Sequence, residues 1–162
     1  MPAYTSYPFD KSEFSEAVES IETAKNNVST EPHYNEIAKS LLIKNHGFQD
    51  VALGPRVSEM KGVPFDLVAT KDNQKILFEV KGARKAWSKS GPTQLARMKL
   101  LFEGLAERGI NVDLFLIQIS LSNSEYRLWD TDGVKTLLTD VDKSVGLKTP
   151  MEPVIEWVVA NF

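Results

Sequence analysis

The chain has 162 residues, of which 42% are hydrophobic and 25% charged, a composition that fits one globular domain and excludes wholesale disorder. Cysteine is absent, which excludes disulfides, thiolate metal sites and a cysteine nucleophile. No run of about 18 apolar residues predicts a membrane span, and the first residues lack the pattern of a secretory signal. We therefore expect a cytoplasmic protein without a membrane partner.

Charge is distributed unevenly along the chain. The net charge is −3, from 19 basic and 22 acidic residues. Between Lys61 and Lys99, nine basic residues accompany three acidic ones, so this segment carries +6 and the remainder −9. A basic middle favours a local anionic partner, and the alternative is an ordinary solvated surface. The acidic balance elsewhere is compatible with an additional protein partner.

Two amphipathic helices are predicted first. Apolar residues recur at helical spacing over Ser12–Lys25 and again over about Glu31–Asn45. Thr30 is expected to cap the second helix, and Gly47 to end it.

The pattern then changes to that of strands. Val51–Val57 is a weak strand, interrupted by Gly54-Pro55. Stronger strands are predicted at Phe65–Thr70 and Ile76–Lys81, and the polar residues 71–74 between them form a turn. These two strands are expected to pair as an antiparallel hairpin.

A helix, a buried strand and a helical tail complete the chain. A helix is predicted from Gln94 to about Arg108, followed by Val112–Ser120, which is apolar nearly throughout and typical of a strand covered on both faces. Tyr126–Trp129 is expected to be an edge strand. The element order predicts an α/β fold with a mixed central sheet flanked by helices. We expect a core at 31–130, helical extensions at 1–30 and 131–162, and one compact domain.

The residues with most chemical content lie at the end of the predicted hairpin. Glu79 and Lys81 project to one face, because side chains alternate along a strand, and the hairpin brings Asp66 next to Glu79. With no Cys and only two His, these oxygen ligands suit Mg²⁺ or Mn²⁺. A carboxylate-held metal can polarise a phosphodiester, and a lysine beside it offsets charge developing on the phosphate. The alternative is an exposed strand face with a cross-strand ion pair.

These residues resemble a known signature. Pro64-Phe65-Asp66, twelve intervening residues and then Glu79-Val80-Lys81 resemble the motif of the PD-(D/E)XK nucleases. The upstream stretch from Glu36 to His46-Gly47-Phe48 is similar to the first helix of archaeal Holliday junction resolvases. The resemblance covers about Glu36–Ser120. It implies a restriction-endonuclease-like core (αβββαβ), with Asp66, Glu79 and the Val80 carbonyl as metal ligands and Lys81 as the catalytic lysine.

The resemblance implies two further site residues. Glu36 would be an auxiliary acid on the first helix, although helical spacing places it nearly opposite the apolar stripe, where a solvent-facing glutamate is the alternative. Gln94 stands at the start of the helix after the lysine strand, where several branches of the family carry a glutamine. The alternative there is an ordinary polar residue of the first turn.

Basic residues follow the predicted site closely. They are expected to contact backbone phosphates and to make binding salt-dependent, and they are Arg84, Lys85, Lys89 and Arg97. Trp87 lies among them, and it either stacks on a base or packs beneath the loop.

The function that we expect is metal-dependent hydrolysis of DNA phosphodiester bonds by an endonuclease, either specific for a structure such as a junction or of the restriction or homing type. A homodimer is favoured, because a junction or duplex has two strands to cut. One alternative is a non-catalytic module that binds nucleic acid or protein on the same fold. Another is a nuclease subunit whose DNA affinity comes from a partner. The complete set of Asp66, Glu79 and Lys81 favours the enzyme, whereas the acidic balance favours the alternatives.

Overall fold

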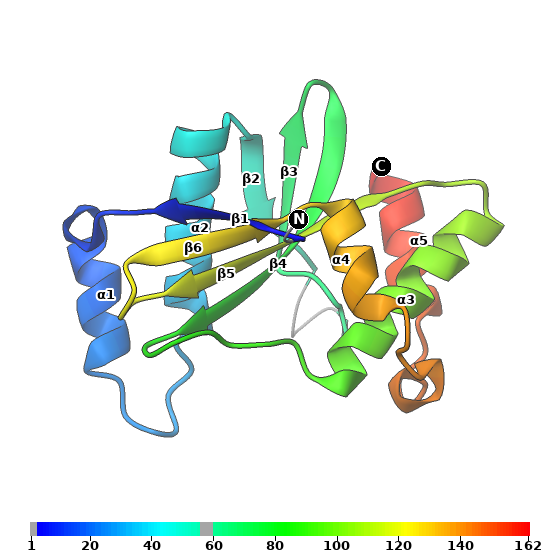
Figure 1. Ribbon diagram of the computed structural model, residues 1–162. Helices are drawn as coiled ribbons and strands as arrows, with labels where there is room; N and C mark the ends of the chain where they lie inside the picture. Colours follow the sequence, from blue (N-terminus) through cyan, green and yellow to red (C-terminus); the bar gives the residue numbers. More distant parts are fainter. Residues whose placement is uncertain (1–2, 56–59) are drawn as a thin grey trace.

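The computed structural model describes residues 3–55 and 60–162, which form a six-stranded mixed sheet flanked by helices (Figure 1). The strands lie in the order β1-β6-β5-β4-β3-β2. Neighbours are antiparallel except β4 and β5, which are parallel. The strands are β1 (Thr5–Pro8), β2 (Gln49–Leu53), β3 (Leu67–Lys71), β4 (Gln74–Ala83), β5 (Asp113–Ser120) and β6 (Glu125–Trp129). The predicted α/β class and mixed sheet are confirmed.

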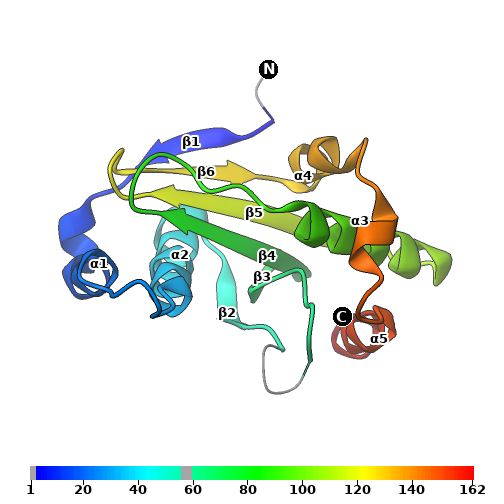
Figure 2. The same cartoon turned by 90° about the horizontal axis from the view of Figure 1, so that it is seen from below.

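Helices cover the sheet in two groups, which Figure 2 shows on opposite sides of the strands. One group packs on the face of Phe78 and Val80 and consists of η1 (Lys11–Phe14), α1 (Ser15–Glu22) and α2 (Glu31–His46). The other packs around Leu77 and consists of α3 (Pro92–Glu107), α4 (Thr131–Leu138), η2 (Lys143–Gly146) and α5 (Glu152–Asn161). In the described part of the chain, no helix has the length and apolarity needed to cross a membrane.

Alternation along β4 decides which layer each functional side chain faces. Phe78 and Val80 belong to the core beneath α2, whereas Leu77 belongs to the core beneath α3. Because successive side chains point to opposite faces, Glu79 and Lys81 face the α3 layer.

The hairpin that carries the candidate site has the predicted connection. Asp72 and Asn73 form its turn with φ of 51° and 65°. Positive φ at both central residues is typical of a type I′ turn, which Asp and Asn tolerate better than other residues. The register pairs Leu67 with Phe78, so Asp66 comes opposite Glu79. The predicted antiparallel hairpin is therefore confirmed.

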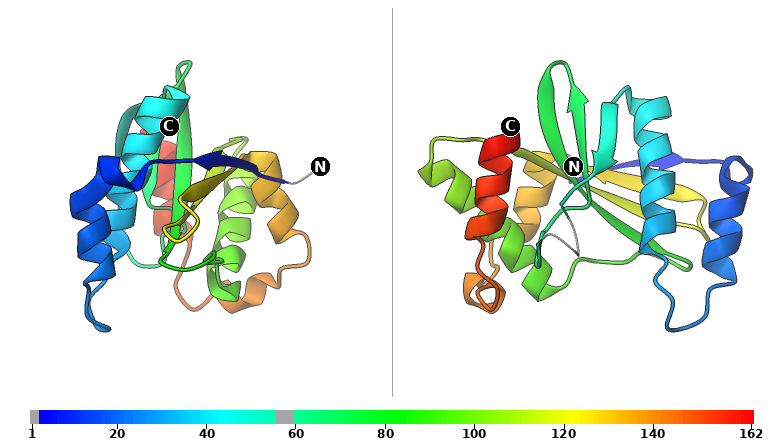
Figure 3. Two further views of the ribbon diagram at one scale, coloured as in Figure 1. Left: turned by 60° about the vertical axis from the view of Figure 1, so that its left-hand side comes forward. Right: turned by 180° about the vertical axis from the view of Figure 1, so that it is seen from behind.

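Helix α2 lies across the strands with α1 at its side, as the right-hand view of Figure 3 shows. It ends as predicted at Gly47, whose φ of 69° is the left-handed conformation of a C-cap. Near its first turn, the Tyr34 ring packs directly on Gly82 of β4, and a Cβ atom at Gly82 would overlap that ring. The absence of a side chain at Gly82 thus sets how closely α2 approaches the strand that carries Glu79 and Lys81.

Three predictions about elements differ from the structure. Tyr126–Trp129 is not at the edge of the sheet, because β1 pairs with β6 and occupies that edge. The four residues of β1 are too few to give a clear alternating pattern, which is why the sequence did not reveal the strand. The strand predicted at Val51–Val57 ends at Leu53, and its last two residues lie outside the described part of the chain. Helix α3 begins at Pro92 with Gly91 as its N-cap, two residues before the predicted start at Gln94.

Replacing Gly82 by Ala tests the close approach of α2 to β4. We expect Gly82→Ala to lower the free energy of unfolding by about 1–3 kcal/mol, since the added methyl group displaces the Tyr34 ring from a packed position. Urea denaturation measures this change. The matched control is Gly91→Ala, where a Cβ atom meets nothing within 4 Å. Equal stabilities of the two variants would contradict this packing.

Candidate active site

Two buried carboxylates lie opposite one another at the centre of the candidate site. Asp66 directly precedes β3, and its backbone N–H donates to the Phe78 carbonyl at 2.7 Å. Its side chain is fully buried, and that of Glu79 on β4 is 2% exposed. The pairing of β3 with β4 therefore places both acids at neighbouring positions of the sheet.

The backbone of β4 orients Asp66. The Val80 N–H donates to Asp66 Oδ2 at 2.7 Å. A hydrogen bond from a backbone amide to a carboxylate is charge-assisted and about twice as strong as a neutral one. Because β3 begins only at Leu67, the Asp66 side chain supplies an acceptor where the strand ladder ends. The Val80 side chain itself packs in the core beneath α2.

Helix α3 orients Glu79. Gln94 lies in the first turn of α3, and its Nε2 donates to Glu79 Oε2. The structure thus brings Asp66, Glu79 and the predicted residue Gln94 together from three elements. Of these, Gln94 acts on the carboxylate and is a positioning residue.

Lys81 lies two residues further along β4, on the same face as Glu79, and is partly buried. Within the described residues, its ammonium group forms no hydrogen bond or ion pair. Its neighbour on β5 is Gln118, which is 4% exposed. Both ends of the Gln118 amide are hydrogen-bonded: its Nε2 donates to the Ser88 carbonyl at 2.9 Å and its Oε1 accepts from Trp129 Nε1 at 2.8 Å.

The donor set suits a hard divalent cation. Mg²⁺ is usually bound through one or two carboxylates and keeps several waters, whereas Ca²⁺ and Zn²⁺ sites use more protein ligands. No group of three or more His, Asp or Glu side chains that could hold a metal occurs among the described residues. Asp66 and Glu79 form a pair of carboxylates, the ligand type that Mg²⁺ and Mn²⁺ prefer. Ligation by the Val80 carbonyl stays a prediction.

The structure does not bring Glu36 to this pair. Glu36 is exposed on α2 and lines a small groove of about 340 Å³ with residues of η1 and α1. It lies two residues from Tyr34, which faces the sheet, and two residues correspond to about 200° around a helix. Glu36 is therefore a solvent-facing glutamate, and it does not take the position of the auxiliary acid that the family resemblance implies.

Arg97 was predicted to contact DNA, but it is a buried structural residue. Its side chain is 4% exposed and donates to the carbonyls of Gly62, Gly146 and Thr149. Burial lowers the pKa of the guanidinium from its ordinary value, and arginine nevertheless stays charged. Arg97 therefore holds the segment that leads to Asp66 against the C-terminal part of the chain, and it is not available to phosphates.

The other predicted basic residues do reach the surface. Arg84, Lys85 and Lys89 are exposed in the segment that joins β4 to α3. Arg84 also donates to the carbonyl of Glu22, at the end of α1, at 3.1 Å. These three cations follow the site directly, as the sequence predicts.

The sequence reasoning missed Gln118 as a residue next to the site. The polarity of Gln118 is the feature of the sequence that could have identified it, because it is the one amide in an otherwise apolar strand interior. A buried polar side chain requires hydrogen-bond partners, so such a residue points to a polar neighbourhood.

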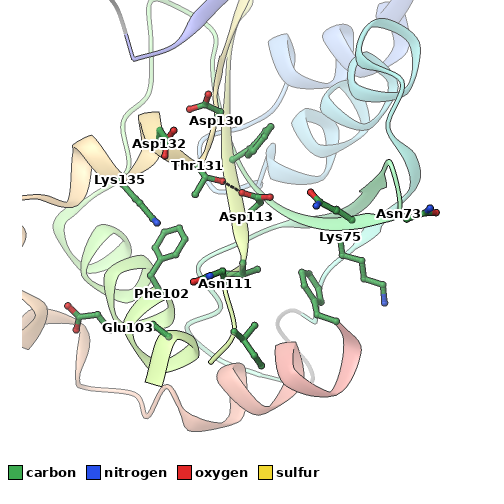
Figure 4. Close-up of a pocket in the computed structure, with 16 residues that line it drawn as sticks. Asn73, Lys75, Phe102, Glu103, Asn111, Asp113, Asp130, Thr131, Asp132 and Lys135 are labelled. Atoms are coloured by element: carbon green, nitrogen blue, oxygen red, sulfur yellow. Dashed lines mark hydrogen bonds between the residues drawn. The ribbon is translucent and has the colours of Figure 1, made fainter. Parts of the chain in front are cut away.

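A hollow of about 1020 Å³ lies elsewhere in the described structure (Figure 4). It is bordered by Lys75 at the start of β4 and Asp113 at the start of β5, the opposite ends from the candidate site. Asp113 accepts a hydrogen bond from Thr131, and Lys135 lies over the Phe102 ring at 5.2 Å. This hollow does not contain the pair of buried acids.

No protein-family model, curated protein or solved structure matches this chain.

Substituting Arg97 by Lys tests its structural role. We expect Arg97→Lys to lower the free energy of unfolding by about 2–4 kcal/mol, since an ammonium cannot reach three carbonyls in the geometry of a guanidinium. The control is Arg108→Lys at the other end of α3, where the side chain is exposed and pairs with Glu152. A surface ion pair contributes about 0–1 kcal/mol. If both variants unfold at the same urea concentration as the wild type, the buried role of Arg97 is wrong.

Proposed function

We propose that this chain is a divalent-metal-dependent nuclease that hydrolyses phosphodiester bonds in DNA, with Asp66, Glu79 and Lys81 at its catalytic centre. One observation carries the proposal: two buried carboxylates face one another across adjacent strands, each oriented by a hydrogen-bond donor, with a lysine following on the same face.

The arrangement of the two acids supports a shared cation. Asp66 and Glu79 occupy opposite positions of neighbouring strands, so one cation could contact oxygens of both. A divalent cation bound there would offset the repulsion between two neighbouring carboxylates. The donors that orient Asp66 and Glu79, the Val80 N–H and the Gln94 amide, stabilise ionised carboxylates and so favour metal binding.

The fold also supports the proposal. The elements α2, β2, β3, β4, α3 and β5 follow one another in the order αβββαβ, with an antiparallel set of strands extended by a parallel one. This order is compatible with the restriction-endonuclease-like core that the motif resemblance implies. The acids lie on the hairpin and the orienting amide on the next helix, so the site depends on this order.

Each residue has a distinct part in the chemistry. A bound Mg²⁺ would supply Lewis acidity toward the phosphodiester. Asp66 and Glu79 would hold it, and Gln94 fixes the rotamer of Glu79. The Lys81 ammonium would offset the negative charge that develops on the phosphate and would orient the attacking water. Arg84, Lys85 and Lys89 would contact the backbone phosphates beside the site.

Partner dependence is the second candidate. The chain outside residues 61–99 carries a net charge of −9, which disfavours independent binding to a long stretch of DNA. A subunit that receives part of its DNA affinity from a second copy or from another protein accounts for this charge. We therefore include a homodimer and a heterologous partner within the proposal.

A cleavage assay tests the proposal. Purified protein is incubated with Mg²⁺ or Mn²⁺ and four-way junction, flap, linear duplex or single-stranded DNA. We expect cleavage by the wild type, inhibition by EDTA, and a loss of at least about 100-fold in Glu79→Gln and Lys81→Met.

Matched substitutions at exposed positions serve as controls. Glu107→Gln and Lys148→Met make the same chemical changes on the surface and should retain wild-type rates. Cleavage that survives in both Glu79→Gln and Lys81→Met would contradict the assignment. A folded wild type that cuts none of these substrates would favour the non-catalytic module, and cleavage that appears only with a partner would identify the subunit.

A further inference from the structure

A stack of aromatic and cationic side chains lies on the same sheet face as the candidate site. Arg127 of β6 has its guanidinium carbon 3.9 Å from the centre of the Trp87 ring and 4.6 Å from that of the Tyr4 ring. The Tyr4 ring in turn lies 4.9 Å from the ring of Trp129. All four side chains are partly exposed.

Sheet register connects this stack to Lys81. Lys81 on β4 is the neighbour of Gln118 on β5, and Gln118 is the neighbour of Arg127 on β6. Neighbouring strands lie about 4.8 Å apart, so the backbone of Arg127 is about 10 Å from that of Lys81. Alternation puts the three side chains on one face, the α3 layer, because Tyr126 and Val80 face the opposite core.

The segment 84–91, which we call the strap, is fixed over this face. Figure 2 shows it leaving β4 and crossing toward β5 and β6 before α3 begins. The Ala86 N–H donates to Ser122 Oγ at 3.2 Å, and the Ser88 carbonyl accepts from Gln118. These two hydrogen bonds hold the strap against the sheet. They also keep Ala86 at a φ of 54°, a conformation that is unfavourable for a residue with a Cβ atom.

Two polar atoms at the strap are buried without a partner. Arg127 Nε and Ser90 Oγ have no hydrogen bond within the described residues. No carboxylate of the described part of the chain forms an ion pair with Arg127. Buried polar groups in native proteins almost always have partners, and a ligand bound at this partly exposed stack would supply the missing ones. The charge of Arg127 indicates that this ligand is an anion.

We propose that the strap, Trp87 and Arg127 form a subsite that binds unpaired nucleotides next to the scissile phosphodiester. Trp87 stacks on a base, and Arg127 together with Arg84, Lys85 and Lys89 binds the phosphates. Stacking on an aromatic ring tolerates any base but requires that the base be unpaired, which a closed duplex does not offer. The inference rests on the proposed nuclease function and adds to it a preference for substrates with single-stranded segments.

Equilibrium binding with EDTA present tests the subsite without cleavage. Fluorescence anisotropy compares a labelled duplex with a single-stranded overhang, carried once as DNA and once as RNA, with the blunt duplex. The wild type should bind one or both overhang substrates about 5- to 150-fold more tightly than the blunt duplex. Equal binding of all three would overturn the proposal, whatever the variants do.

Two variants locate the subsite. Trp87→Ala removes the stacking ring, and Arg127→Lys keeps the charge but loses the planar group between two rings. Each should remove most of the preference for the overhang while leaving blunt-duplex binding nearly unchanged. Arg108→Lys is the matched control and should behave as the wild type. If Trp87→Ala does not fold, Trp87→Leu, which keeps apolar bulk but has no ring, and Arg127→Lys decide the question. Folded variants that keep the full preference would overturn the subsite.

The outcomes separate this inference from the nuclease proposal. Overhang-selective binding that depends on Trp87, without cleavage of any substrate, would support the subsite and contradict the nuclease. Cleavage that depends on Glu79, without a preference for overhangs, would support the nuclease and overturn the subsite.

Discussion

The hydrogen bond from the Val80 N–H to Asp66 Oδ2 is the interaction on which the candidate site depends. It is formed because β3 begins one residue after Asp66, so an amide of β4 is offered to the Asp66 side chain at that position. The same pairing places Asp66 opposite Glu79 and turns Lys81 to their face. A change in register by one residue would move Glu79 and Lys81 into the apolar core beneath α2. The register of the hairpin therefore determines which side chains form the candidate site.

Helix α3 holds Glu79 and the segment before Asp66 in place from one side of the sheet. Gln94 binds Glu79 directly, and one turn later Arg97 binds the Gly62 carbonyl, four residues before Asp66. Arg97 also binds the carbonyls of Gly146 and Thr149, so the C-terminal part of the chain is connected to the same segment. On the far side, Gly82 lets α2 approach β4 closely. Strand β4 is thus fixed by packing on both faces.

The sequence was sufficient for the features that have strong local signals. The turn residues Asp72 and Asn73, the alternation at Glu79 and Lys81 and the cap at Gly47 led directly to the hairpin, the shared face and the end of α2. Features that depend on distant partners were not accessible. Strand β1 is short and is stabilised by its pairing with β6. The burial of Arg97 depends on distant segments, because η2 packs on α3 and the Gly146 and Thr149 carbonyls accept its hydrogen bonds. The placement of Glu36 follows from the helical spacing alone, and there the spacing was a better guide than the resemblance to a family.

Metal binding by the pair of acids is the central claim, and calorimetric titration with Mn²⁺ in the absence of DNA measures it most directly. We predict one class of binding sites in the wild type, lost in Asp66→Asn and in Glu79→Gln and retained in Glu107→Gln. This result would assign the metal to the buried pair independently of any substrate. Binding of equal strength in all four proteins, or no binding by the folded wild type, would contradict the account.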